Sequence, residues 1–325
     1  MLLCEFFVAT KSAESSLRMT ETRYLHVPDG LAGERADVAL AKLLGMSRSA
    51  CTELLASGGV VFNGKPLGKS DRIADGAILE VTLAPVVNRL EVVPVEVEDF
   101  RIVYEDDDIV VIDKPAGVAA HPSVGWSGPT VSGALLQLGV KVTTSGAQER
   151  AGIVQRLDVG TSGLMTVAKT ELAYSRLKQM FRDRSVHKVY HALVQGHPDP
   201  SSGTIDAPIA RHPKAEFKFT VAADGKPSVT HYSTLEAFPS ASLLEVILET
   251  GRTHQIRVHF SQFRHPLVGD TMYGADPKLA AKLGIEHQWL HATRLSFVHP
   301  ITGLQVEFTS PHPVELTRVL EKLVI

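Results

Sequence analysis

The sequence predicts an α+β fold in which a small domain precedes a larger one. The chain has 325 residues, more than a single hydrophobic core usually organises, so we expect two domains. Hydrophobic residues make up 44% and charged residues 21%, which is ordinary for globular proteins. Strand-like and helix-like segments occur in clumps, not in strict alternation. This favours a central mixed, mostly antiparallel sheet with flanking helices.

The small domain is expected at residues 23–84, and its first half is helical. Apolar residues recur at mostly helical spacing through residues 34–44. A second helix is expected to begin at Ser47, whose hydroxyl suits an N-cap, and to stop at Gly58 and Gly59.

The second half of this domain is expected to form strands. The turn dipeptide Asn63-Gly64 follows the apolar residues 60–62 and predicts a tight hairpin. Another strand is expected at residues 78–83. Seven basic and seven acidic residues lie between residues 23 and 84, so their charges cancel.

A connection is expected at residues 85–99, and the larger domain at residues 100–325. Between residues 91 and 108 eight acidic residues accompany one basic residue, and such charge runs usually form solvated connections. In the larger domain, one helix is expected to begin near Thr130 and another to span residues 171–181. The expected strands cover residues 102–104, 109–112, 164–168, 190–195, 229–235 and 243–248.

Neither a membrane span nor a signal peptide is expected. No apolar run approaches the roughly 18 residues that a bilayer requires. The apolar N-terminus lacks a basic leading segment, so residues 1–22 are interpreted as an N-terminal extension. Two cysteines, Cys4 and Cys51, cannot form a disulfide framework, and a reducing cytoplasm is the simplest location.

The candidate for chemistry is an Asp at the end of a predicted strand. Residues 152–158 run into a polar turn at Asp158, and an Asp in such a place most often shapes the turn. Two basic stretches change this interpretation. Residues 176–188 hold five Lys or Arg and one Asp, and residues 250–269 hold no acid. Basic stretches that flank a lone carboxylate suit a polyanionic substrate.

Other kinds of site fit the sequence less well. His254 and His259 are not at the i, i+4 spacing of a helical zinc pair, so no metal is expected. Glycine-rich nucleotide-binding motifs are absent, and no cofactor is expected. A hydrolase with paired carboxylates would need a second acid near Asp158. The nearest candidate in sequence, Asp183, lies at the basic end of a predicted helix, where an ion pair explains it better.

The ordered motifs of the larger domain resemble those of the RluA-type RNA pseudouridine synthases. The run Arg156-Leu157-Asp158-Val159-Gly160-Thr161-Ser162-Gly163 is similar to the Arg-Leu-Asp-x-x-Thr-Ser-Gly signature of that family. Eight further segments match in order: residues 104–106, 113–117 with 121–122, 188–190, 225–227, 250–259, 265–270, 273–274 and 290–292. The resemblance implies the pseudouridine synthase fold and an isomerase that converts uridine to pseudouridine in RNA without metal or cofactor.

The resemblance also implies roles for single residues. Asp158 takes the place of the nucleophile, Tyr190 of the active-site tyrosine that contacts the target base, and Arg257 of the basic partner of Asp158. Arg156 takes the place of the arginine that helps to hold the target base out of its helix. The family usually has His before this arginine, whereas this chain has Gln155.

Residues 23–84 are similar to the alpha-L RNA-binding module, the type named for small-subunit ribosomal protein S four. The similarity rests on Arg48 and its serine neighbours, on Gly58, and on the segment 60–65. In such modules one helical face contacts RNA phosphates, so Arg48 and Lys65 are candidate RNA contacts. The module in front of a full synthase implies the subgroup that acts on large-subunit ribosomal RNA.

The expected partner is therefore RNA, specifically large-subunit ribosomal RNA or its precursor particle, bound by a monomer. The basic stretches supply four further candidate RNA contacts, Arg182, Arg184, Lys188 and Arg252. Two alternatives stay open at this point: transfer RNA as the target, and an RNA-binding protein without catalysis. A pure binding protein has no need for the complete set of catalytic candidates, which favours the enzyme.

Overall fold

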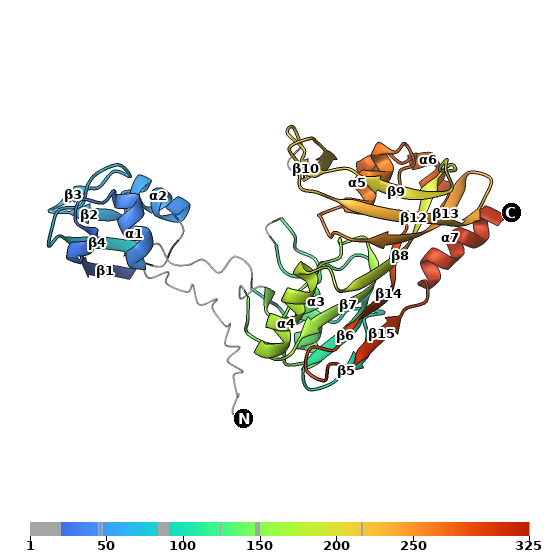
Figure 1. Ribbon diagram of the computed structural model, residues 1–325, viewed down its shortest axis with the longest axis horizontal. Helices are drawn as coiled ribbons and strands as arrows, with labels where there is room; N and C mark the ends of the chain where they lie inside the picture. Colours follow the sequence, from blue (N-terminus) through green and yellow to red (C-terminus); the bar gives the residue numbers. More distant parts are fainter. Residues whose placement is uncertain are drawn as a thin grey trace, which may run out of the picture. The chain divides into compact units, whose positions relative to one another are not determined.

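The chain forms two compact units in a computed structural model, with the boundary between residues 89 and 90 (Figure 1). The structure describes residues 21–44, 46, 48–83, 91–123, 125–146, 150–215 and 217–324. Ser47, the expected N-cap, and most of the expected N-terminal extension lie outside these residues.

The N-terminal unit is a four-stranded antiparallel sheet with two α-helices, in the strand order β1-β4-β2-β3. Its elements are β1 (Glu21–His26), η1 (Asp29–Leu31), α1 (Ala36–Leu44), α2 (Arg48–Ala56), β2 (Val60–Phe62), β3 (Lys65–Pro66) and β4 (Ile78–Leu83). The predicted hairpin is confirmed, since Asn63 and Gly64 join β2 to β3 with φ of 51° and 76°. Strand β1 was not predicted, and residues 21 and 22 of the expected extension belong to it.

A small hydrophobic core holds this unit together. Leu40 of α1 and Leu55 of α2 pack against Leu79 and Val81 of β4. Cys51 is buried in the same core and carries a free thiol. The two helices therefore cover one face of the sheet, as their apolar spacing indicates.

The expected connection, residues 85–99, is divided in the structure. The described part, residues 91–99, contacts the C-terminal unit: the Val95 N–H donates to the Gly133 carbonyl at 3.3 Å. Val97 packs against the core of that unit, as does Phe100. This stretch therefore contributes to the packing of the larger domain despite its acidic composition.

The C-terminal unit is built on a nine-stranded sheet, in the order β5-β6-β7-β14-β8-β13-β12-β9 with β15 paired to β14. Its strands are β5 (Arg101–Glu105), β6 (Ile109–Lys114), β7 (Ser162–Ala168), β8 (His187–Gln195), β9 (Ser202–Asp206), β12 (Val229–Ala237), β13 (Ala241–Leu248), β14 (Leu290–Val298) and β15 (Gln305–Thr309). Strands β7 and β14 pair in parallel and the other pairs are antiparallel. The predicted mixed, mostly antiparallel sheet is confirmed.

The remaining elements of this unit are one hairpin and the helices that flank the sheet. They are α3 (Val131–Gln137), α4 (Glu171–Arg182), β10 (Ile209–Arg211), β11 (Phe219–Val221), α5 (Gln255–Gln262), η3 (Thr271–Tyr273), α6 (Pro277–Leu283) and α7 (Val314–Val324). The side chain of Thr130 caps α3 by accepting from the Gly133 N–H at 3.0 Å, which confirms the helix predicted to begin near Thr130.

Both faces of the sheet are covered. All six residues of β6 are buried, because Val110 and Ile112 pack toward α3 on one face. On the other face Ile109 and Val111 pack toward α4. Further along the sheet α5 covers the first face and α7 the second (Figure 1). A side chain on a central strand is therefore packed against a helix unless it lies where no helix covers the sheet.

No helix among the described residues is long and apolar enough to cross a membrane. Within the same part of the chain, no group of three His, Cys, Asp or Glu side chains is arranged to hold a metal ion.

A buried carboxylate organises the N-terminal unit. Asp37 is 4% exposed and accepts from Arg35 Nε at 3.0 Å and from Arg48 Nη2 at 2.8 Å. These two hydrogen bonds lower the pKa of Asp37 to about 2. The candidate RNA contact Arg48 thus also serves the fold, although 63% of its side chain stays exposed.

We predict that acid weakens the N-terminal unit through Asp37. A carboxyl with a lowered folded-state pKa stabilises the fold above its unfolded pKa, near 3.8, and this contribution is lost as the pH falls toward about 2. Amide hydrogen exchange of α1 and β4, measured from pH 5 to pH 2, should show the loss. The Asp37→Asn variant should lack this part of the pH dependence; an identical pH dependence in the variant would contradict the prediction.

Candidate active site

Asp158 lies on the loop that leads into β7, and the loop is closed by a turn. The Thr161 N–H donates to the Asp158 carbonyl at 3.0 Å. Gly163 follows with φ of 111°, and a Cβ there would lie 2.4 Å from the Ala292 carbonyl oxygen on β14. Only glycine fits this approach, so the Thr-Ser-Gly sequence fixes the loop against the sheet.

A buried lysine ties the other side of the loop to a neighbouring segment. The Lys114 ammonium is fully buried at the end of β6 and donates to the carbonyls of Val118 at 2.7 Å and Val159 at 3.2 Å. Burial lowers the pKa of Lys114 to about 7, against the opposing charges of Asp158 and Asp113. The Val159 carbonyl also accepts from the Gly117 N–H at 2.9 Å, so the carbonyl next to Asp158 is held from two directions.

The carboxylate of Asp158 meets the guanidinium of Arg257, the residue that the family resemblance gives as its basic partner. Nη1 of Arg257 lies 3.1 Å from Oδ2 of Asp158. The same guanidinium binds Asp270 with two bonds, Nε to Oδ2 at 2.7 Å and Nη2 to Oδ1 at 2.9 Å. Burial opposes the charge on Arg257, but the bonds to Asp270 and the charge of Asp158 raise its pKa above the ordinary value.

Gln255 fixes the first turn of α5, from which Arg257 projects. Its amide oxygen accepts from the Thr250 hydroxyl at 2.7 Å and from the Arg252 N–H at 3.0 Å. Its amide nitrogen donates to the Val229 carbonyl and to the Thr230 hydroxyl, both at 3.0 Å. All these groups lie in or beside β12 and the loop before α5, so the first turn of α5 is anchored to the sheet.

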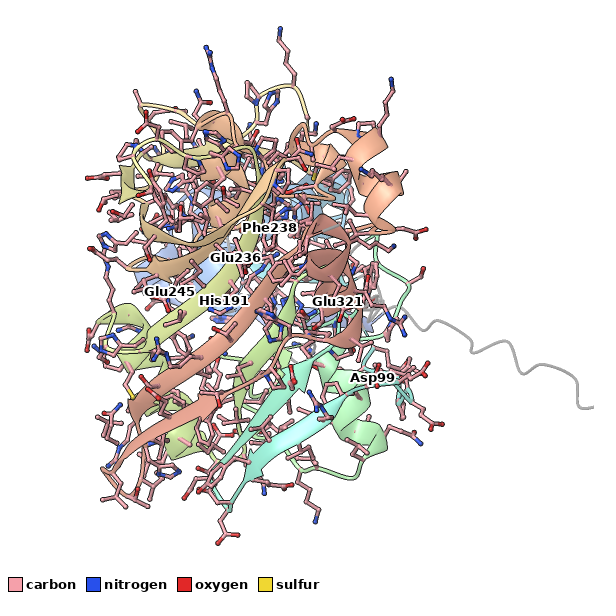
Figure 2. All side chains as sticks on the ribbon, turned by 90° about the vertical axis from the view of Figure 1, so that its right-hand side faces the viewer. Asp99, His191, Glu236, Phe238, Glu245 and Glu321 are labelled. Carbon is pink, nitrogen blue, oxygen red and sulfur yellow. The ribbon has the colours of Figure 1, made fainter. Side chains whose placement is uncertain are left out.

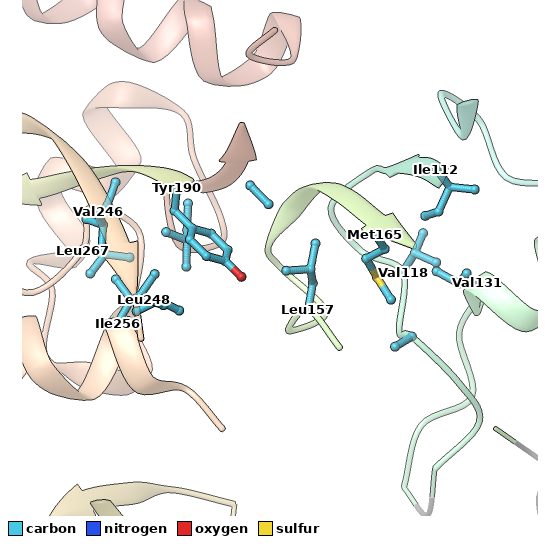
Figure 3. Packing of buried hydrophobic residues seen from close by; sticks show 14 of the residues in the cluster. Ile112, Val118, Val131, Leu157, Met165, Tyr190, Val246, Leu248, Ile256 and Leu267 are labelled. Carbon is cyan, nitrogen blue, oxygen red and sulfur yellow. The ribbon is translucent and has the colours of Figure 1, made fainter. Parts of the chain in front are cut away.

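Tyr190 belongs at once to the core and to the pocket that contains Asp158. Its ring lies between Val246 and Leu248 on one side and Leu157 on the other (Figure 3). Burial and the charge of Asp158 raise the pKa of its hydroxyl, so the hydroxyl is neutral at pH 7. The next residue on β8, His191, faces the opposite side of the sheet beside Glu245 of β13 (Figure 2).

Arg156 lies at the mouth of the same pocket. It is exposed and makes no hydrogen bond or ion pair with the part of the chain that the structure describes. It lines both the pocket of Asp158 and an adjoining cleft. Its guanidinium is therefore available to a ligand that enters the site.

The adjoining cleft gathers the other basic candidates of the larger domain. It has a volume of about 540 Å³ and is lined by Arg182, Arg184, Lys188 and Arg252, next to Arg156. Burial, and then the charge of Arg184, lower the pKa of Lys188. The structure thus brings together two basic stretches that are far apart in sequence.

Glu249 is an acidic residue in the same cleft. It lies 3.9 Å from Arg184 and 2.7 Å from Nε2 of His231. The amide nitrogen of Gln155, the residue that departs from the family pattern, is buried nearby without a hydrogen-bond partner among the described residues. These two side chains distinguish the wall of the cleft from a uniformly basic surface.

Several residues of the site had no role in the sequence-based predictions. They are Lys114, His254, Asp270 and Tyr273. All four lie in segments that match the family motifs, but the motifs do not show which side chains contact one another. Arg48 and Lys65 belong to the N-terminal unit, and Lys65 is exposed on β3.

We predict that Asp270 carries much of the stability of the site. Asp270→Ala leaves the buried guanidinium of Arg257 with one partner, and such a loss costs about 3–5 kcal/mol of the free energy of unfolding. Chemical denaturation should show a clearly smaller loss for Asp158→Ala, since Asp158 makes one contact and is more exposed. Equal losses for the two variants would show that Asp270 is not the main support.

Comparisons with known proteins agree with this geometry. A model of the RNA pseudouridylate synthase family matches residues 108–262. An uncharacterised RNA pseudouridine synthase of Mycobacterium bovis is 59% identical over 301 residues, which cover 93% of this chain and 98% of the relative. A ribosomal large subunit pseudouridine synthase D of Xylella fastidiosa is 40% identical over 312 residues, with coverage of 93% and 92%.

Solved structures show the same fold. The human RNA pseudouridylate synthase domain containing 1 has a TM-score of 0.55 and 29% identity, and the match covers 68% of this chain and 86% of that one. The human RNA pseudouridylate synthase domain containing 4, with a TM-score of 0.53, 24% identity and coverage of 68% and 92%, supports the fold alone. This chain therefore belongs to the RluA-type family of RNA pseudouridine synthases, which are isomerases that act on RNA.

Proposed function

We propose that this enzyme converts specific uridines of large-subunit ribosomal RNA to pseudouridine, with Asp158 as its nucleophile. The observation that carries the proposal is the Asp158 carboxylate, held by Arg257 in a pocket that adjoins a basic cleft. The choice of ribosomal RNA is supported by relatives about 40% identical to this chain that are named ribosomal large subunit pseudouridine synthase D.

The reaction breaks the bond between the uracil nitrogen and the ribose, turns the base and rejoins it through a carbon. Arg257 favours the charged, reactive form of Asp158 and fixes its orientation. Tyr190 offers a flat ring beside Asp158 on which the extruded base can stack. Its neutral hydroxyl is available as a hydrogen-bond donor.

The basic cleft binds the phosphates on either side of the target nucleotide in this proposal. The cleft offers four long basic side chains that can reach a backbone passing over Tyr190, namely those of Arg182, Arg184, Lys188 and Arg252. The N-terminal unit adds Arg48 and Lys65 as contacts to more distant RNA. Because that unit has no net charge, these contacts are few and supplement those of the cleft.

The first test of this proposal replaces the carboxylate of Asp158. Asp158→Asn keeps the size and one acceptor oxygen but removes the charge, so the variant should fold and bind RNA while forming no detectable pseudouridine. Pseudouridines would be mapped in ribosomal and transfer RNA from cells with no enzyme, wild-type enzyme or the Asn variant. Modification by the Asn variant would refute the nucleophile, and sites confined to transfer RNA would refute the ribosomal target.

A second prediction concerns Arg156 and the extrusion of the base. Its free guanidinium can occupy the space that the departed base leaves and contact phosphates there. Arg156→Ala should therefore slow modification of a structured stem-loop by roughly 10–100-fold, equivalent to about 1.4–2.8 kcal/mol. The penalty should shrink on an unstructured RNA with the same uridine, because less stacking must be broken.

Single-turnover rates on the two RNAs measure this difference. A purely structural role predicts equal losses on both RNAs and a lower Tm of the protein. That outcome would remove Arg156 from the residues that hold the base out of its helix.

A further inference from the structure

His254 lies beside Asp158 in the pocket, but the two side chains do not bond to each other. Nε2 of His254 is 3.9 Å from Oδ2 of Asp158, which is too long for a hydrogen bond. Both residues line the pocket, and each side chain is 14% exposed. A polar ligand atom in the pocket can therefore contact both groups at once.

The ring of His254 is held in place without serving the helix that follows it. His254 is the N-cap residue of α5, yet its side chain makes no capping bond, and its φ of 58° is uncommon for a residue with a side chain. Phe219 and Tyr273 each contact the ring edge-on, with centroids 5.6 Å away. This strained, packed position aims the ring at the pocket.

The hydroxyl of Tyr273 determines which ring nitrogen carries the proton. It accepts from the Phe219 N–H at 3.0 Å and lies 2.7 Å from Nδ1 of His254. A hydroxyl has one hydrogen to donate, and this one forms no other hydrogen bond with the described residues. With the Phe219 N–H on its oxygen, the hydroxyl is assigned as the donor to Nδ1, which places the proton of the neutral ring on Nε2, the nitrogen nearest to Asp158.

The surroundings keep the ring neutral. Burial lowers the pKa of His254, the charge of Asp158 opposes this, Arg257 and Arg156 lower the pKa further, and Asp270 opposes them. A neutral ring adds no charge to the ion pair between Asp158 and Arg257. It still presents one N–H to the pocket.

We propose that the Nε2–H of His254 donates a hydrogen bond to an oxygen of the extruded nucleotide and so holds that nucleotide against Asp158. The acceptor is a uracil carbonyl or a ribose hydroxyl, either of which offers the required lone pair. This assignment rests on the proposed role of Asp158. It adds a substrate contact to the site, and it makes Tyr273 a positioning residue that sets the tautomer of His254.

Two variants separate the donor from the rest of the side chain. The amide nitrogen of Gln reaches about as far as Nε2, whereas that of Asn reaches only as far as Nδ1. On a stem-loop with a mapped uridine, His254→Asn should lower the single-turnover rate roughly 10–100-fold, and His254→Gln should lose less than about 10-fold. The control His197→Gln, an exposed histidine that bonds the Ser242 hydroxyl away from the pocket, should match the wild type.

The tautomer is measured directly by ¹⁵N NMR of the imidazole in the full-length enzyme. The wild type should show the proton of His254 on Nε2, and Tyr273→Phe should mix the two tautomers. A merely structural role of Tyr273 would leave the tautomer unchanged. A proton on Nδ1 in the wild type would overturn the proposal, and so would wild-type rates for both His254 variants.

Modified RNAs identify the acceptor. The target uridine is replaced by 2′-deoxyuridine, 2-thiouridine or 4-thiouridine, each of which removes one oxygen acceptor. The rate penalty of His254→Asn should vanish on one of these RNAs, and a penalty that persists on all three refutes the contact. Asp158→Asn in the same assay separates the two proposals: an active Asp158 variant defeats the nucleophile, whereas an inactive one with unaffected His254 variants defeats only the donor.

Discussion

The two-bond contact between Arg257 and Asp270 is the interaction on which the rest of the site depends. A guanidinium that is 7% exposed needs a counter-charge, and Asp270, 2% exposed, supplies it with both oxygens. Because Nε and Nη2 are fixed in this way, the position of the third nitrogen, Nη1, is fixed too, and it points toward Asp158. The orientation of the proposed nucleophile is thus set by a bond in which it takes no part.

Much of the fold was predictable because its signals are local. The Asn63-Gly64 turn needs two positive φ angles, which this dipeptide tolerates better than almost any other, and the structure has both. The threonines at 130 and 170 cap the two helices they precede through their hydroxyl oxygens. Strand β1 was missed because Tyr24 and its neighbours are largely exposed, so the strand lacks a clear apolar alternation and depends on pairing with β4.

The site was predictable only as a set of motifs. Helix α5 ends with the His265 N–H bonded to the Phe260 carbonyl at 2.8 Å and with Arg264 at φ of 65°. This reversal returns the chain so that Asp270 contacts Arg257, and no local sequence pattern predicts the reversal. Tyr190 shows the same difficulty in another form, because an aromatic in an apolar strand predicts a core residue, and here it is a core residue that also lines the pocket.

Because Arg257 is shared between two carboxylates, the proposed nucleophile can stay reactive beside a strong cation. An isolated ion pair would hold Asp158 by two short bonds and occupy its lone pairs. Asp270 takes the two shorter bonds, and Asp158 receives one at 3.1 Å. Its carboxylate is oriented, yet its other oxygen, Oδ1, accepts no hydrogen bond from the described residues and can face the substrate. The three groups together carry one negative charge, so in the proposed function the basic cleft beside them attracts RNA toward an acidic centre.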